Sequence, residues 1–269
     1  MHPMHPMLHI AVQAARAAGR VLLQHMDRPD TLNIRQKNKN DFVSEVDRMA
    51  EEAIIATIRR HYPDHGFLAE ESGKHNPDSD FIWIIDPLDG TTNYLRGIPQ
   101  FSVSIAFKER GRLSQAVVYD PAKEELFSAG RGVGSQLNGR RLRVTQRRAL
   151  DGALFATGFP FRQPALYKSY MGMFTKLVGE TGDVRRQASA ALDLAYVAAG
   201  RLDGFWELAL HEWDIAAGVL LVQEAGGLIG DPGGGHSHLR TGHILAANPK
   251  LYAAAVRKIG DDFRRLKPH

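Results

Sequence analysis

The chain has 269 residues, of which 43% are hydrophobic and 24% charged, a balance that excludes global disorder and is typical of a globular protein with a substantial core. It contains no cysteine, which excludes disulfides, thiolate catalysis and cysteine-ligated metal sites. The formal net charge of +4 permits an acidic partner without requiring one. The opening MHPMHPML lacks the basic-then-apolar order of a secretory signal, and no apolar run approaches the roughly 18 residues of a membrane span, so we expect a cytoplasmic protein.

Helical patterns give way to extended ones along the first half of the chain. Apolar residues recur with helical spacing over residues 8–27, and a second helix is predicted from Ser44, with Asp47 placed to complete a capping box. The predicted strands that follow cover residues 67–69, 81–85, 101–107, 113–119 and 124–129. Asn138-Gly139 then indicates a tight hairpin. This succession predicts an antiparallel meander.

Strands and helices alternate in the second half. The predicted strands cover residues 154–157, 203–207 and 244–246, and the predicted helices cover 167–178, 189–199, 214–225 and 251–266. No linker composition separates the halves. We therefore expect an α+β chain of two intimately packed lobes, residues 1–145 and 146–269.

Several carboxylates stand where a predicted strand ends or a helix begins. They are Asp47, Glu70, Glu71, Asp86, Asp89 and Asp214. Each has a structural explanation by itself, since Asp214 is a candidate helix N-cap and the two aspartates of DPLD could stabilise a turn. Brought to one rim, however, such carboxylates would repel one another unless cations neutralised them. Mg²⁺ fits an all-oxygen ligand set, whereas the lack of cysteines and of paired histidines near the acids argues against zinc.

Three segments carry a resemblance to a known family. "AEES", "WIIDPLDGTTN" and "WDIAAG" resemble, in order and spacing, the three motifs of the inositol monophosphatase family. The likeness continues through "RRQASAALDLAYVAAG" and "EAGGLIGD", and it is closest to the bacterial SuhB-type members. The resemblance implies a layered αβαβα sandwich of the sugar-phosphatase type, split into the two lobes described above. It also implies a Mg²⁺-dependent, lithium-sensitive, homodimeric phosphatase of myo-inositol monophosphates.

The resemblance further implies two or three Mg²⁺ ions per site. The first would be held by Glu70, Asp86 and the carbonyl of Leu88, and the second by Asp86, Asp89 and Asp214. Glu70 would contribute to a third, weaker site through water. In this arrangement the metals activate water, and no nucleophilic side chain is required.

The remaining implied roles concern the reacting water and the substrate. Thr91, oriented by Asp47, would hold the attacking water near the catalytic Glu70. Substrate contacts are implied for Asp89, Gly90, Thr91, Ser189, Ala190, Glu207 and Asp214. Relatives often carry glycine before the small hydroxyl residue of the substrate loop, where this chain has Ala188. The alanine at position 188 leaves the implied metal ligands unchanged, but it puts the identity of the preferred substrate in question.

Two alternative functions remain open from the sequence. A 3′-phosphoadenosine or fructose-bisphosphate phosphatase of the same superfamily would need an additional basic pocket, which the sequence does not obviously supply. Alternatively, SuhB-type proteins are associated with ribosomal RNA transcription antitermination, so the chain could act as a binding module for NusA and RNA polymerase. The arginines that could serve a protein or nucleic-acid partner are Arg140, Arg141, Arg143, Arg147, Arg148, Arg185 and Arg186. A solvated edge or a subunit interface explains these arginines at least as well.

Overall fold

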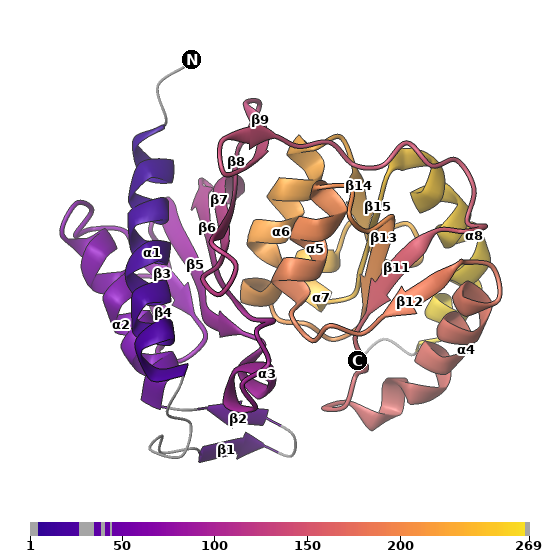
Figure 1. The fold of residues 1–269 in the computed structure, drawn as a ribbon, viewed down its shortest axis with the longest axis horizontal. Helices are drawn as coiled ribbons and strands as arrows, with labels where there is room; N and C mark the ends of the chain where they lie inside the picture. Colours follow the sequence, from indigo (N-terminus) through magenta and orange to yellow (C-terminus); the bar gives the residue numbers. More distant parts are fainter. Residues whose placement is uncertain (1–4, 27–34, 39–40, 44, 267–269) are drawn as a thin grey trace.

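A computed structural model describes residues 5–26, 35–38, 41–43 and 45–266 and shows five alternating layers, αβαβα (Figure 1). Helices α1 (Pro6–Met26) and α2 (Glu45–Arg59) cover one face of an eight-stranded sheet. In the middle layer, α5 (Ala190–Ala198) and α6 (Glu212–Glu224) separate this sheet from a five-stranded one. The outer layer consists of α4 (Tyr167–Val178) and α8 (Pro249–Arg264). The predicted fold class is therefore confirmed.

The eight-stranded sheet has the order β10-β9-β8-β7-β6-β5-β3-β4. Its strands are β3 (Gly66–Ala69), β4 (Gly73–His75), β5 (Phe81–Asp89), β6 (Ser102–Glu109), β7 (Arg112–Asp120), β8 (Glu125–Gly130), β9 (Gly134–Leu137) and β10 (Arg140–Arg141). The predicted antiparallel meander is confirmed from β5 to β10, whereas β3 and β5 are parallel neighbours. This parallel pair matters for the site, because the carboxyl ends of both strands meet at one edge.

The five-stranded sheet has the order β12-β11-β13-β15-β14. Its strands are β11 (Leu154–Thr157), β12 (Asp183–Arg185), β13 (Gly204–Glu207), β14 (Leu228–Gly230) and β15 (Ile244–Ala247). The remaining short elements are the hairpin of β1 (Arg35–Asn38) and β2 (Asp41–Val43), the helices α3 (Thr91–Leu95) and α7 (His238–Thr241), and a 3₁₀ turn at Pro164–Leu166.

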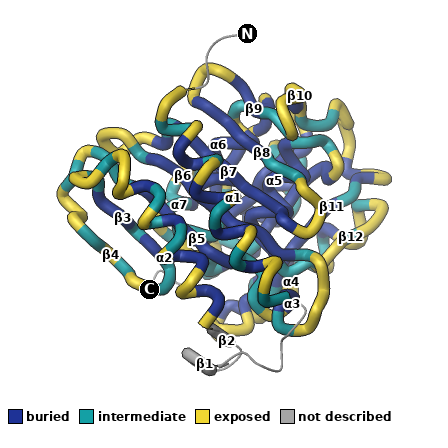
Figure 2. Tube along the Cα trace, turned by 60° about the vertical axis from the view of Figure 1, so that its left-hand side comes forward, coloured by how far each residue is buried: buried dark blue, intermediate teal, exposed yellow. Residues whose placement is uncertain are grey.

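The two middle helices can lie between the sheets because their side chains are apolar or small around most of the circumference. Every residue of α5 is buried, and five of its nine residues are alanine or valine. At Gly218 of α6 an added Cβ would lie 2.5 Å from the Leu194 side chain, so a glycine permits the close approach of the two helices. Figure 2 shows these helices and the central strands as mostly buried.

One hydrophobic cluster joins the two halves of the chain, since it includes Ile84 and Val118 of the large sheet together with Leu192 and Leu220 of the middle helices. The division into lobes near residue 145 falls between β10 and β11 and stays a prediction. None of the described helices combines the length and apolar character that crossing a membrane would demand.

The structure agrees with most predicted elements and corrects some of their bounds. Helix α4 and strand β11 have the predicted bounds. The strand predicted to end at residue 85 continues to Asp89. Helix α6 begins at Glu212, so Asp214 is its third residue and not its N-cap. The predicted cap at Ser44 lies outside the described residues.

Candidate active site

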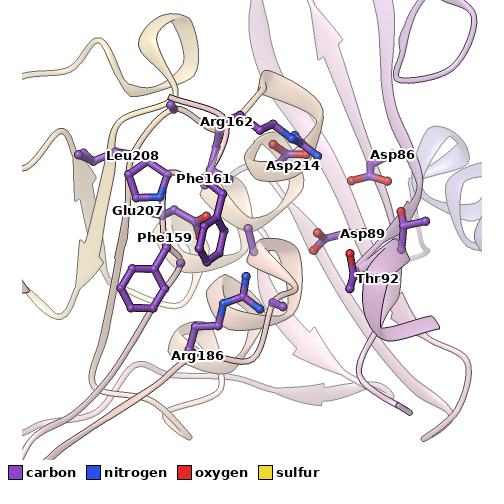
Figure 3. A pocket seen from close by; sticks show the side chains of 18 of the residues that line it. Asp86, Asp89, Thr92, Phe159, Phe161, Arg162, Arg186, Glu207, Leu208 and Asp214 are labelled. Carbon is purple, nitrogen blue, oxygen red and sulfur yellow. The ribbon is translucent and has the colours of Figure 1, made fainter. Parts of the chain in front are cut away.

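A β-bulge explains why two aspartates stand three residues apart at the end of β5. In a regular strand, residues three apart point to opposite faces. Asp86 pairs with Ser104 of β6, whereas Asp89 pairs with Ser102, so β5 carries one extra residue between the two pairs. Pro87, which has no N–H to offer a ladder, falls within this bulge. The extra residue turns both carboxylates toward the same pocket (Figure 3).

The parallel pairing of β3 with β5 brings a third acid beside them. Ala69 pairs with Ile85, and the N–H of Glu70 donates to the Ile85 carbonyl at 3.1 Å, so Glu70 lies next to Asp86. Burial raises the pKa of the Asp86 carboxyl well above its usual range, and the negative charges of Glu70, Asp89 and Asp214 raise it further. Four acids from three elements therefore act on one another electrostatically.

The fourth acid is positioned by a contact between the large sheet and α6. Ser104, the β6 residue that pairs with Asp86, donates its hydroxyl to the Trp213 carbonyl at 3.3 Å. Asp214 follows directly, and its Oδ2 accepts the His211 N–H at 2.6 Å in the first turn of α6. The predicted N-cap at Asp214 is therefore wrong: His211 is the N-cap, and Asp214 accepts its N–H from the third helical position. The same carboxylate also lines the pocket.

Asp89 is oriented by the N-terminus of α5. Its Oδ2 accepts the Ser189 hydroxyl and the Ala191 N–H, each at 2.7 Å. Burial raises the pKa of Asp89 to about 6, although these hydrogen bonds and one from the Ala190 N–H favour the ionised form. Ser189 is fully buried and is also the N-cap of α5. Its contact with Asp89 fixes the carboxylate plane, and its predicted contact with substrate stays a prediction.

The turn after β5 places Thr91 beside a buried acid. Gly90 has φ 95°, a left-handed conformation that favours glycine, and an added Cβ would lie 3.0 Å from the Gln100 carbonyl oxygen. The Thr91 hydroxyl has two acceptors in reach, Asp47 Oδ1 at 3.3 Å and the Leu88 carbonyl at 3.1 Å. Because the hydroxyl has one proton, its lone pairs remain able to accept a hydrogen bond from water.

The opposite wall of the pocket comes from the second half of the chain. The cavity has a volume of about 440 Å³, and Phe159, Phe161, Arg162 and Arg186 line it together with Glu207 (Figure 3). Burial raises the pKa of Glu207 to about 8, with further increases from Asp214 and Asp89 and opposing effects of the two arginines. The Arg186 guanidinium lies 5.5 Å from the centroid of the Phe161 ring. A cation–π contact therefore shapes this wall.

Most residues of this wall were not predicted from the sequence. The segment "GFPFR" follows β11 directly, and aromatic and basic residues after a strand end were the available signal. Among the arginines proposed for partners, Arg147 pairs with Asp203 at 3.3 Å and Arg185 pairs with Asp183. Arg186 lies in the pocket, so it is available to a small substrate. The exposed strand β10 agrees with a solvated edge.

The carboxylate oxygens of these acids are suitable ligands for a hard cation, although they do not form a complete coordination sphere by themselves. Within the part of the chain that the structure describes, no three Asp, Glu or His side chains are assembled as a metal-binding group. Asp89 and Asp214 each already accept a backbone N–H. The donors are nevertheless all oxygens, and the mutual repulsion at Asp86 favours a cation among them. Mg²⁺ suits such a site, because it retains waters and requires few carboxylates.

Comparisons with known proteins agree with this geometry. The sequence profile described as the inositol monophosphatase family matches residues 3–261. The chain belongs to the inositol monophosphatase family. It is 52% identical to the Nus factor SuhB of Pseudomonas aeruginosa over 261 residues, which are 95% of this chain and 96% of that protein.

Solved structures extend the family assignment to the fold. The extragenic suppressor protein SuhB of Bartonella henselae has a TM-score of 0.92 and 43% identity, covering 95% of this chain and 98% of that one. The inositol monophosphatase of Anabaena has a TM-score of 0.84 and 38% identity, covering 97% and 96%. The predicted family and fold are therefore confirmed.

Nearly all of the predicted site residues lie together in one pocket. Those that line the pocket are Glu70, Asp86, Leu88, Asp89, Gly90, Thr91, Ala190, Glu207 and Asp214. Asp47 and Ser189 do not line it and instead contact Thr91 and Asp89. Glu71 does not line it either, and its backbone N–H donates to Glu51 Oε2 at 2.8 Å. The roles of these residues in binding metal and substrate stay predictions.

Ala188 gives a prediction about stability. Its φ of 64° costs an L-residue roughly 1–2 kcal/mol, whereas glycine adopts it freely but loses about 0.5–1 kcal/mol more chain entropy on folding. Ala188→Gly is therefore expected to raise the free energy of unfolding by about 0.5 kcal/mol in urea denaturation. Ala199→Gly, at φ −83°, is the matched control and should lower it. Equal losses in both variants would contradict the strain at Ala188.

Proposed function

We propose that this chain is a Mg²⁺-dependent phosphatase that hydrolyses myo-inositol monophosphates and similar small phosphate monoesters. The observation that carries the proposal is the convergence of Glu70, Asp86, Asp89 and Asp214 on one pocket beside the Gly90-Thr91 turn. Membership of the inositol monophosphatase family supports a phosphatase activity. The choice of Mg²⁺ rests on the all-oxygen donor set.

The acids would hold the metal in two groups that share one member. Glu70, Asp86 and the Leu88 carbonyl form one group, and Asp86, Asp89 and Asp214 form the other. When bound, Mg²⁺ supplies charge neutralisation for phosphoryl transfer and lowers the pKa of water. Glu70 would also reach a third, weaker ion through water.

The remaining residues orient the reactants. The Thr91 hydroxyl, held by Asp47 Oδ1 at 3.3 Å, would accept a hydrogen bond from the attacking water. The N–H groups of Gly90 and Thr91 would donate to phosphate oxygens. Glu207 and Ala190 line the part of the pocket in which the polyol would lie. A carboxyl with a pKa of about 8 can donate to or accept from a hydroxyl near neutral pH.

A phosphate-release assay tests this function. The panel contains inositol, glycerol and nucleotide monophosphates together with 3′-phosphoadenosine and fructose bisphosphates, each with and without MgCl₂. We expect release that depends on Mg²⁺ and favours inositol monophosphates. Because Arg162 and Arg186 line the pocket and could bind a second phosphate, a preference for the bisphosphates would replace the proposed substrate. No release from any ester with Mg²⁺ would refute the proposed activity.

The relatives named Nus factor SuhB favour a second candidate function, a binding module of a transcription antitermination complex. We propose NusA and RNA polymerase as its partners, and a pull-down against each tests this. If the Asp89→Asn variant still binds these partners, the binding role does not depend on the phosphatase activity. Loss of binding in that variant would tie the partner to the metal site. A homodimer, checked by analytical ultracentrifugation, is expected for both functions.

A further inference from the structure

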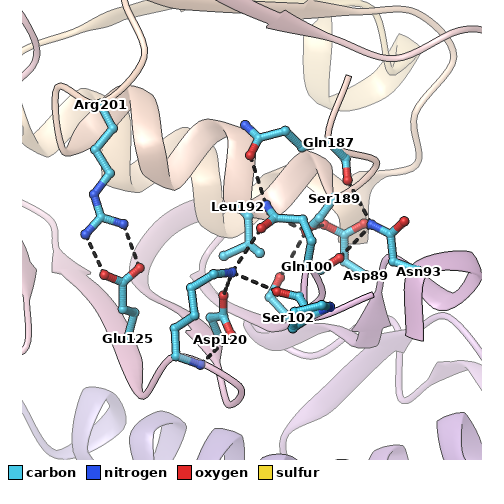
Figure 4. Close-up of polar contacts among 12 residues, drawn as sticks. Asp89, Asn93, Gln100, Ser102, Asp120, Glu125, Gln187, Ser189, Leu192 and Arg201 are labelled. Atoms are coloured by element: carbon cyan, nitrogen blue, oxygen red, sulfur yellow. Dashed lines mark hydrogen bonds and ion pairs between the residues drawn. The ribbon is translucent and has the colours of Figure 1, made fainter. Parts of the chain in front are cut away.

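One buried amide links two distant segments beside the acids. Asn93, in α3, is 8% exposed. Its Nδ2 donates to the Gln100 carbonyl at 2.7 Å and to the Gln187 carbonyl at 2.8 Å (Figure 4). A carboxamide has two N–H protons, and here both are used. Since a carboxylate of the same shape offers only acceptors, the chemistry of this position requires an amide.

Gln187, whose carbonyl accepts from Asn93, also makes hydrogen bonds through its side chain. Gln187 Nε2 donates to Asp193 Oδ1 at 2.9 Å, and its Oε1 accepts from Gln100 Nε2 at 3.3 Å. Asp193 is a buried residue of α5. Contacts of both its carbonyl and its side chain therefore fix Gln187, the residue that precedes Ala188, whose φ is 64°. A strained residue persists only where its surroundings determine its conformation.

This fixed segment leads directly to the group that orients Asp89. Two residues after Gln187, the Ser189 hydroxyl donates to Asp89 Oδ2, and the Ala191 N–H donates to the same oxygen. The Ser189 hydroxyl also lies 3.4 Å from that of Ser102 (Figure 4). A displacement of the segment 187–189 would move both donors, so the plane of the Asp89 carboxylate depends on Asn93.

We infer that Asn93 is a positioning residue for the metal site: its carboxamide holds the segment 187–189 so that Ser189 and the start of α5 orient Asp89. The inference rests on the proposed function and deepens it, because it names a residue that sets the affinity for the divalent cation without touching it. Residues that orient a metal ligand typically affect metal affinity or activity by 10- to 100-fold.

The test measures Mg²⁺ binding by isothermal titration calorimetry, with MgCl₂ as the only ligand and no substrate. Asn93→Asp keeps the size of the side chain and replaces the donors by acceptors that face two carbonyls. We expect roughly 10- to 100-fold weaker Mg²⁺ binding, at a temperature where circular dichroism shows the variant folded. Gln100→Met is the matched control, because it keeps the carbonyl that Asn93 contacts and removes only the side-chain contacts of Gln100, to Gln187 and to Lys123.

A double-mutant cycle separates positioning from general destabilisation. If Asn93 acts through Ser189, then Asn93→Asp should weaken Mg²⁺ binding far less in a Ser189→Ala background than in the unsubstituted protein. Additive effects would overturn the inference. Should Asn93→Asp fail to fold, Asn93→Ala removes both donors without placing an acceptor against the two carbonyls. It is expected to weaken Mg²⁺ binding by a similar factor, and unchanged affinity would overturn the inference.

The outcomes also distinguish this inference from the proposed function. Mg²⁺ binding by the unsubstituted protein with equal binding by Asn93→Asp would overturn the inference alone. Absence of Mg²⁺ binding by the unsubstituted protein would overturn both.

Discussion

Asp89→Asn is expected to lower kcat/KM for an inositol monophosphate by about 10³-fold, or roughly 4 kcal/mol of transition-state stabilisation. The substitution removes one negative charge from the proposed ligand set. The fold should survive, because the amide oxygen of asparagine can still accept from the Ser189 hydroxyl and the Ala191 N–H. The measurement is Mg²⁺-dependent phosphate release, paired with thermal unfolding of the metal-free protein.

Asp203→Asn is the matched control for this variant. Asp203 is also a buried carboxylate that accepts a backbone N–H, from Leu154 at 2.9 Å, but it does not line the pocket. We expect it to leave turnover unchanged. Near-normal turnover of Asp89→Asn would remove Asp89 from the catalytic site, whereas equal losses in both variants would indicate a general effect of removing a buried charge.

The second large effect concerns the stability of the metal-free protein, which is expected to fall as the pH rises through the range in which Glu207 ionises. Burial raises the pKa of Glu207 from 4.5 to about 8 in the folded state. Between these values the folded protein binds a proton that the unfolded chain releases. The free energy of unfolding therefore decreases with rising pH, and this contribution is fully present only below the unfolded pKa.

Glu207→Gln removes this pH dependence. At pH 8 the variant is expected to be more stable than the unsubstituted protein by roughly 3 kcal/mol relative to their difference near pH 5. Urea denaturation in EDTA at the two pH values measures this difference. Asp86 and Asp89 are common to both proteins, so the part of their titration that does not depend on the charge of Glu207 cancels in the comparison. Parallel pH profiles of the two proteins would show that Glu207 is ionised in the fold across this range.

Most elements of the fold are predictable from local patterns. Helix α4 and strand β11 have the predicted bounds, because their apolar periodicity is uninterrupted and their ends carry clear signals. The short strands β4, β12 and β14 were missed, since three residues are too few to show a period. Their pairing partners lie elsewhere in the chain and provide the stabilisation that the local sequence lacks.

The kind of functional site could also be predicted from the amino-acid sequence. The residue types and the motif order predicted an oxygen-donor pocket, and the acids Glu70, Asp86, Asp89 and Asp214 do line one cavity. Position at the end of a predicted element was not sufficient by itself, because Asp47 and Glu71 also stand at such ends and do not line the cavity.

The sequence by itself thus determined most of the longer helices and strands, the acidic residue types of the site and the family to which the chain belongs. Only the tertiary structure decided how the acids face the pocket: the extra residue in β5 turns Asp86 and Asp89 to one side, and the N-terminus of α5 orients Asp89. It also decided the wall built by Phe161, Arg162 and Arg186. The physical reason is that register and contacts between segments about 100 residues apart depend on packing of the whole chain, which no local period encodes.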